Sequence, residues 1–77
     1  MASVPLLDLI AGTLGVPPEQ ITGESDMSNT KKWDSLRHVM LMTELETNYG
    51  IELSDKEMME TVSVAMIRAL LQQRGVS

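Results

Sequence analysis

Residues 33–50 read WDSLRHVMLMTELETNYG, and this stretch decides the fold of the chain. Asp34 stands where a helix-capping carboxylate belongs, and Gly50 stands where a left-handed residue would end the helix. Between them, apolar residues recur at helical spacing: Leu41, Leu45 and Tyr49. The pattern predicts a helix from about Ser35 to Tyr49, with the Ser35 hydroxyl exposed at its start.

A second amphipathic pattern precedes this helix. Its apolar positions are Leu6, Leu7, Ile10 and Leu14. We expect Ser3 to cap the helix, Pro5 to lie in its first turn and Gly15 to end it. Residues 16–32 are rich in Pro, Gly, Ser, Thr and Asn, which predicts a long ordered loop held to the core by Ile21.

Two further helices are predicted after residue 50. Ser54 and Glu57 have the spacing of a capping box, so a short third helix should begin there. It carries two methionines, Met58 and Met59. Ser63 can start a last helix that continues to Gly75. Its apolar positions are Met66, Ile67, Leu70 and Leu71.

These elements predict an all-α fold in one domain over residues 1–77. We expect a small up-and-down four-helix bundle, with three longer helices and one short helix. The inner faces of the helices and of their links should form the core. Its expected members include Leu41, Leu45, Leu53, Val62 and Ile67.

The composition narrows the classes of function. The chain has 77 residues and no cysteine, so any thiol chemistry would have to come from an added group. Eleven acidic and six basic residues give a net charge of −5, which argues against nucleic acid as a partner. The N-terminus lacks a basic region before its apolar residues, and no apolar run has the length of a membrane span. The sequence therefore predicts a cytoplasmic, soluble monomer with no membrane partner.

An extended pattern surrounds the candidate serine. It consists of Asp34-Ser35-Leu36, then Leu41, Leu45, Tyr49-Gly50-Ile51-Glu52-Leu53 and Asp55. With these residues at these spacings, the chain resembles the acyl carrier protein and peptidyl carrier protein family. The resemblance implies a 4′-phosphopantetheine arm on Ser35, transferred from coenzyme A by a separate phosphopantetheinyl transferase that uses Mg²⁺. The thiol of the arm would carry acyl groups as thioesters. Asp34 and Leu36 flank the attachment point, and in the family this leucine is read by the transferase and by partner enzymes.

The position of Ser35 is suited to such an arm on physical grounds. Free backbone amides and the positive end of the helix dipole favour the negative charge of a phosphodiester. The alternative is an ordinary first-turn serine whose hydroxyl bonds a neighbouring amide. A catalytic serine is not expected, because His38 is the only histidine and forms no triad. We expect His38 to be a solvated helix residue and Trp33 to cover the core. No spacing of metal ligands is present.

The expected partners are acyl-loading, acyl-processing and acyl-transfer enzymes, besides the transferase. The residues predicted to contact them are Leu36, Arg37, Met40, Glu44, Met58 and Met59. The acidic residues predicted to form a solvated face or a docking strip are Glu44, Glu46, Glu52, Asp55 and Glu57.

This surface differs from that of bacterial fatty-acid carriers, which place acidic residues along the helix after the serine. Arg37, Met40 and Thr47 occupy comparable positions here. The difference favours a discrete carrier in a polyketide, nonribosomal peptide or related pathway. The alternatives are a housekeeping fatty-acid carrier and an unmodified helical adaptor that binds proteins through its exposed methionines.

Overall fold

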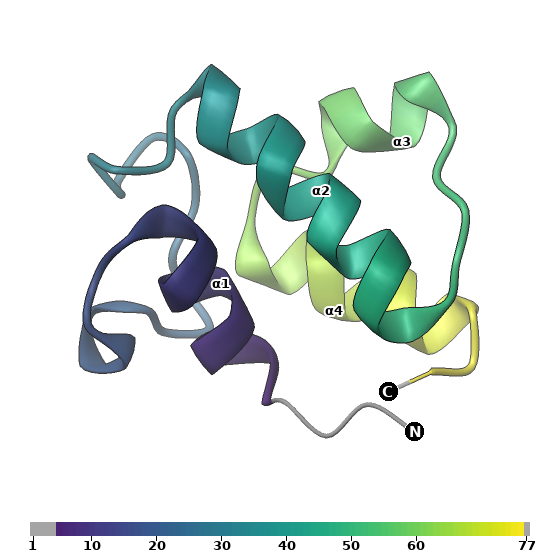
Figure 1. The fold of residues 1–77 in the computed structure, drawn as a ribbon, viewed down its shortest axis with the longest axis horizontal. Coiled ribbons are helices and arrows are strands. Elements are labelled where there is room, and N and C mark those ends of the chain that lie inside the picture. The colour runs from purple at the N-terminus through teal and green to yellow at the C-terminus, as the bar shows by residue number, and fades with distance from the viewer. Residues whose placement is uncertain (1–4, 77) are drawn as a thin grey trace.

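Residues 5–76 of the chain are described by a computed structural model, shown in Figure 1. The elements in chain order are α1 (Leu6–Leu14), the short 3₁₀ helix η1 (Pro18–Gln20), α2 (Ser35–Tyr49), α3 (Asp55–Glu60) and α4 (Val64–Gln73). The described part of the chain contains no strand, only an isolated bridge between Asp26 and Ser63. The all-α prediction, with three longer helices and one short helix, is confirmed.

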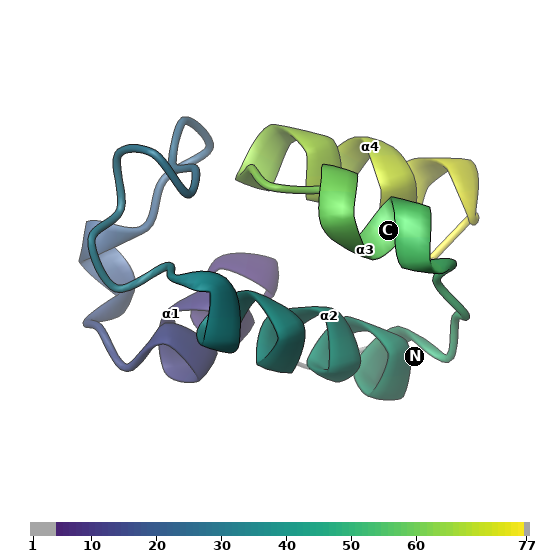
Figure 2. The ribbon, with the colours of Figure 1, turned by 90° about the horizontal axis from the view of Figure 1, so that it is seen from above.

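The helices form two layers. Figure 2 shows α1 and α2 on one side of the molecule and α3 with α4 on the other, while the loop between α1 and α2 lies at one end. In both views α2 and α4 run in the same direction. The helix that joins them in the chain, α3, runs in the opposite direction, as an up-and-down course requires. The start of α2 therefore lies at the end of the molecule where the long loop reaches it.

The helix boundaries follow local signals in the sequence. Gly15 and Gly50 adopt left-handed conformations, with φ values of 74° and 65°, and end α1 and α2 as predicted. Ser54 and Glu57 form the predicted capping box of α3, and the Ser63 side chain accepts a hydrogen bond from the Met66 amide at the start of α4.

The start of α1 differs from the prediction. Pro5 is the cap residue and lies before the helix, so the expectation that it occupies the first turn is wrong. Its carbonyl accepts from the Leu9 amide at 3.0 Å, and no side chain among residues 5–76 caps the helix. The predicted cap, Ser3, lies outside the described residues.

The core lies between the two layers. Its buried apolar members are Ile10, Ala11, Leu14, Ile21, Trp33, Leu41, Met42, Leu45, Leu53, Val64, Ile67, Leu70 and Leu71. The predicted inner positions on α2 and α4 are therefore confirmed, but Val62 is only half-buried. Val62 belongs to the extended link before α4, where its carbonyl accepts from the Met27 amide at 3.0 Å. The fully buried valine is Val64, because α4 begins there and turns that side chain inward.

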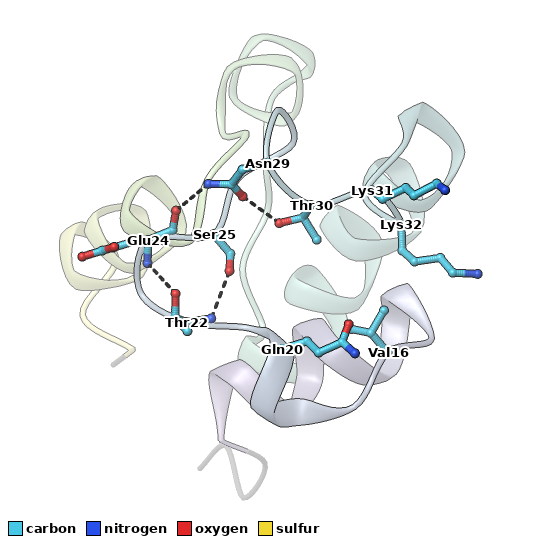
Figure 3. Close-up of a pocket in the computed structure, with 9 residues that line it drawn as sticks. All are labelled: Val16, Gln20, Thr22, Glu24, Ser25, Asn29, Thr30, Lys31 and Lys32. Carbon is cyan, nitrogen blue, oxygen red and sulfur yellow. Dashed lines mark hydrogen bonds between the residues drawn. The ribbon is translucent and has the colours of Figure 1, made fainter.

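The long loop is ordered by its own hydrogen bonds and by apolar contacts: Ile21 is in the core, and Val16 and Met27 pack against it. Ile21 is buried, as predicted, but the 3₁₀ turn before it was not anticipated. Figure 3 shows the Ser25 hydroxyl accepting from the Thr22 amide, and the Asn29 side chain donating to the Glu24 carbonyl. The loop also joins α4, because the Val64 amide donates to the Ser25 carbonyl at 2.9 Å.

The two faces of α2 give a direct test of the fold. Leu45 has no exposed surface, whereas Met40 is 49% exposed. We expect Leu45→Ala to lower the free energy of unfolding by about 2–5 kcal/mol, because it leaves a cavity in the core. Met40→Ala should change it by less than about 1 kcal/mol. Urea unfolding followed by circular dichroism measures both values, and equal losses would mean that the faces of α2 are assigned wrongly.

Candidate functional site

The candidate site is built on the first turn of α2. Asp34 is the cap residue, with an extended backbone, and its carboxylate Oδ1 accepts from the Arg37 amide at 2.9 Å. The Arg37 guanidinium lies 3.2 Å from the other carboxylate oxygen. The hydrogen bond from the Arg37 amide, helped by the charge of the guanidinium, holds the pKa of Asp34 below its ordinary value. The predicted cap is confirmed, and it makes Ser35 the first residue of the helix.

Ser35 has the local chemistry that a phosphodiester requires. The residue is exposed, and its hydroxyl makes no hydrogen bond to another described residue. Within the described part of the chain, the amides of Ser35 and Leu36 also have no protein acceptor, because the Asp34 side chain takes only the Arg37 amide. Two free amides and the helix dipole therefore lie beside the hydroxyl, and both favour an anion there.

An apolar surface continues from the serine along the outer side of α2. It comprises Leu36, Val39 and Met40, which are all exposed, and we call it the α2 apolar surface. Leu36 is 70% exposed, so it is not a core residue. Glu44 is also exposed and lies one turn beyond Met40. The residues on α2 predicted to contact partners thus lie at the surface, apart from Arg37, which is half-buried and paired with Asp34.

The two methionines of α3 have different environments. Met59 is 76% exposed, whereas Met58 is half-buried and packs against the core. The half-burial of Met58 limits the side-chain surface that it can offer to a partner. The methionine of α3 available for contact is therefore Met59.

His38 differs most from its prediction. We expected a solvated side chain, but His38 is 7% exposed and both of its ring nitrogens are hydrogen bonded. Nδ1 lies 2.9 Å from Nε1 of Trp33, and Nε2 lies 2.6 Å from the carbonyl oxygen of Met58. Trp33 is buried against the core as predicted. Because both nitrogens are occupied, His38 cannot serve as a base for Ser35 in this structure.

The spacing of α2 contains the signal that would have placed His38 correctly. Leu41 and Met42 follow it by three and four residues, and both are fully buried. Residues with this separation share one face of a helix, so His38 belongs to the inner face. The prediction relied on the polarity of the His38 side chain and did not take into account on which face of the helix it lies.

The predicted acidic face divides into two groups. Glu44, Glu52 and Asp55 are exposed. Glu46 accepts from the Leu53 amide at 2.9 Å, and Glu57 accepts from the Ser54 amide and pairs with Arg74. The Arg74 hydrogen bond is the main cause of the lowered pKa of Glu57. Glu46 and Glu57 are structural residues, so the strip available to a partner is shorter than predicted.

Elsewhere in the described residues, the surface has a hollow beside the long loop. The hollow beside the long loop is lined by polar groups that bond one another, and its two lysines, Lys31 and Lys32, extend outward in Figure 3. No group of acidic, histidine or cysteine side chains in the described residues could hold a metal ion. Among these residues there is also no helix long and apolar enough to cross a membrane.

Comparisons with known proteins cover most of the chain. Residues 5–71 match the family model described as phosphopantetheine attachment site. A relative from Saccharopolyspora erythraea, named acyl carrier protein, is 42% identical over 60 residues, which cover 75% of this chain and 63% of the relative. A second acyl carrier protein, from Coprothermobacter proteolyticus, is 36% identical over 59 residues, which cover 77% of this chain and 72% of the relative. The chain thus spans a little under two thirds of the length of the first relative.

The cap at Asp34 gives a prediction for the pH dependence of stability. The pKa of Asp34 is lower in the fold than its ordinary value of 3.8, so its carboxylate stabilises the fold above that value. This contribution is lost as the pH falls through the lowered pKa. Asp34→Asn keeps a capping side chain that does not titrate. Between about pH 6 and about pH 3, the variant should therefore lose less stability than the wild type.

Urea midpoints measured across that range test this expectation. Glu52→Gln is the control, because it removes an exposed carboxylate that makes no hydrogen bond in the described structure, and it should follow the wild type. A wild-type slope in Asp34→Asn would show that the carboxylate contributes nothing as a charged cap.

Proposed function

Because this chain belongs to the acyl carrier protein family, whose prosthetic group is a covalent 4′-phosphopantetheine, we propose that Ser35 bears this arm and that the chain carries acyl groups on it as thioesters. Members of this family are carriers rather than catalysts. The observation that carries the proposal is the exposed Ser35 at the first position of α2, inside the matched range and beside two unoccupied backbone amides.

The transfer to Ser35 is chemically simple for this chain. Ser35 Oγ forms a bond to phosphorus, the phosphoanhydride bond of coenzyme A breaks, and adenosine 3′,5′-bisphosphate leaves. The separate transferase takes the hydroxyl proton and supplies the Mg²⁺. The part of this chain is to present the hydroxyl, and the Asp34 cap does so by fixing the turn in which the serine stands.

The arm supplies the thiol that the sequence lacks, and the helices supply the surface by which partner enzymes recognise the carrier. The α2 apolar surface begins beside the attachment point, and the exposed Met59 lies on α3, which His38 links to α2. Exposed apolar residues clustered in this way are typical of protein-binding surfaces. We propose that the transferase and the acyl-processing enzymes bind here, through Leu36, Met40 and Met59.

The same surface supports a carrier of a dedicated pathway. Met40 and Arg37 stand where the resemblance to fatty-acid carriers would place acids, and Arg37 is paired with Asp34. A basic docking surface would find little attraction at these two positions. We therefore favour polyketide, nonribosomal peptide or related acyl transfer over housekeeping fatty-acid synthesis.

The attachment site is tested by loading the purified protein in vitro. Incubation with coenzyme A, Mg²⁺ and a broad-specificity phosphopantetheinyl transferase should add one phosphopantetheinyl group, and Ser35→Ala should abolish the addition. Intact-mass analysis measures both. Ser28→Ala is the control, because Ser28 is an exposed serine of the long loop, and this variant should still be loaded. Loading of Ser35→Ala would refute the assignment, and no loading of the wild type would favour an unmodified adaptor.

The pathway proposal is tested by changing the charge beside the arm. The loaded wild type should be a poor substrate for a malonyl transferase or ketosynthase of fatty-acid synthesis. Arg37→Asp combined with Met40→Glu should raise kcat/KM with these enzymes by about tenfold or more at low salt, and added salt should reduce the gain.

A second double variant shows whether a gain comes from charge beside the arm or from the net charge of the protein. Arg68→Asp with Ala69→Glu makes the same change in net charge at exposed positions of α4, and it should bring no comparable gain. If the wild type is already processed as efficiently as a fatty-acid carrier, housekeeping fatty-acid synthesis is the better assignment.

A further inference from the structure

The hydrogen bonds of His38 fix its tautomer. An indole nitrogen only donates, so Trp33 Nε1 donates to His38 Nδ1, which must be unprotonated. A neutral imidazole with a bare Nδ1 carries its proton on Nε2, and that nitrogen donates to the Met58 carbonyl at 2.6 Å. The two rings lie with centroids 6.1 Å apart and planes inclined by 28°. Trp33, His38 and Met58 thus form one directed chain from the residue before the cap to α3.

The Met58 carbonyl needs this donor. Carbonyls in the last turn of a helix have no partner within it, and the amide four residues after Met58 belongs to Val62. That amide donates to Glu60 instead, at 3.0 Å. His38 therefore satisfies a carbonyl at the end of α3 that would otherwise be unpaired beside the core, which is a costly state.

The short helix α3 depends on such contacts. It has six residues, none of which is classed as buried, and only Met58 of its side chains is among those packed against the core. Its polar ties run to the two neighbouring helices. Arg74, at the end of α4, holds Glu57 and the Glu52 carbonyl, while His38 on α2 holds the carbonyl of the next α3 residue, Met58. His38 stands three residues after Ser35, so it connects the position of α3 directly to the attachment turn.

We infer that His38 is a positioning residue for the loading of Ser35: its neutral side chain holds the end of α3 at a fixed place relative to the first turn of α2, and the transferase recognises the two together. This inference rests on the proposed attachment at Ser35. It assigns His38 no contact with the arm and no proton transfer. Its effect is to fix the backbone of α3, which carries the exposed Met59, relative to α2, which carries the exposed Leu36.

The hydrogen-bond chain is tested first, independently of loading. The protein has one histidine and one tryptophan, so each of these residues gives a single set of side-chain signals. Imidazole ¹⁵N spectra of the unmodified protein near neutral pH should show a bare Nδ1 and a protonated Nε2, and the indole N–H should exchange slowly with solvent. In Trp33→Phe the Nδ1 nitrogen loses its donor but Nε2 keeps the Met58 carbonyl as its acceptor, so the Nε2–H tautomer should persist and only the Nδ1 resonance should shift. A wild-type Nδ1–H tautomer would overturn the inference.

Loading kinetics test the positioning role. With coenzyme A saturating and the carrier concentration varied, His38→Leu should raise KM by roughly five- to tenfold with little change in kcat, because α3 is no longer held in place. His38→Gln, whose amide can donate to Met58 and does not titrate, should restore most of the affinity. The control is Leu71→Val, a core change on α4 that should lower stability without raising KM.

The outcomes separate the two hypotheses. If wild-type Ser35 is not loaded, the proposed function fails and the positioning role fails with it. If the wild type is loaded and folded His38→Leu is loaded with an unchanged KM, the positioning role alone is wrong. If His38→Leu does not fold, His38→Phe and His38→Gln decide: the inference requires a raised KM in the first, which has no donor for the Met58 carbonyl, and a nearly normal KM in the second.

Discussion

The cap at Asp34 is the contact on which the rest of the structure depends. Its carboxylate accepts from the Arg37 amide and its carbonyl accepts from the His38 amide at 2.8 Å, so the chain can enter α2 at one place only. The start of a helix also fixes its rotation. From this start Ser35 and Leu36 face outward, while His38 and the leucine stripe face the core. A shift of one residue would turn every side chain by about 100° and bury the hydroxyl-bearing face.

How much of the fold and of the candidate site could be predicted from the sequence depends on how far apart in sequence the interacting residues are. The boundaries of α2 and α3 were predictable, because Asp34, Gly50 and Ser54 act on amides and carbonyls within four residues. The burial of His38 could have been predicted from its position on the helix, but its hydrogen bond to α3 could not, since that partner is a carbonyl twenty residues away. Val62 was misplaced for a similar reason, because its environment is set by the long loop. The local structure that supports the proposed attachment at Ser35 was predictable, because the cap and the exposed first turn depend on residues close in sequence. The surface around it was predicted less well, because the neighbour that shapes it, α3, is placed by long-range contacts.

The molecule divides its side chains between two tasks. Apolar burial between the layers supplies cohesion, and the largest members of that core have no exposed surface. The helix that completes the recognition surface is instead held by hydrogen bonds from His38 and Arg74. Hydrogen bonds are directional, so they fix a position more strictly than apolar contact does, while each adds only about 1 kcal/mol to stability. A short helix with this kind of attachment is well placed without being deeply anchored.

The pairing of Arg37 with Asp34 changes how the surface beside the serine should be understood. A free cation there would repel basic partners at long range, but an ion pair at 3.2 Å presents a dipole whose field falls off within a short distance. The pair therefore reduces both attraction and repulsion in the first turn. What remains on the outer side of the helix is apolar: Leu36, Val39 and Met40. We therefore expect discrimination between partners at this position to depend mainly on shape and on apolar burial, with charge acting through the more distant Glu44, Glu52 and Asp55. Methionine suits such a surface, because its flexible side chain can fit enzymes of different shape without loss of contact area.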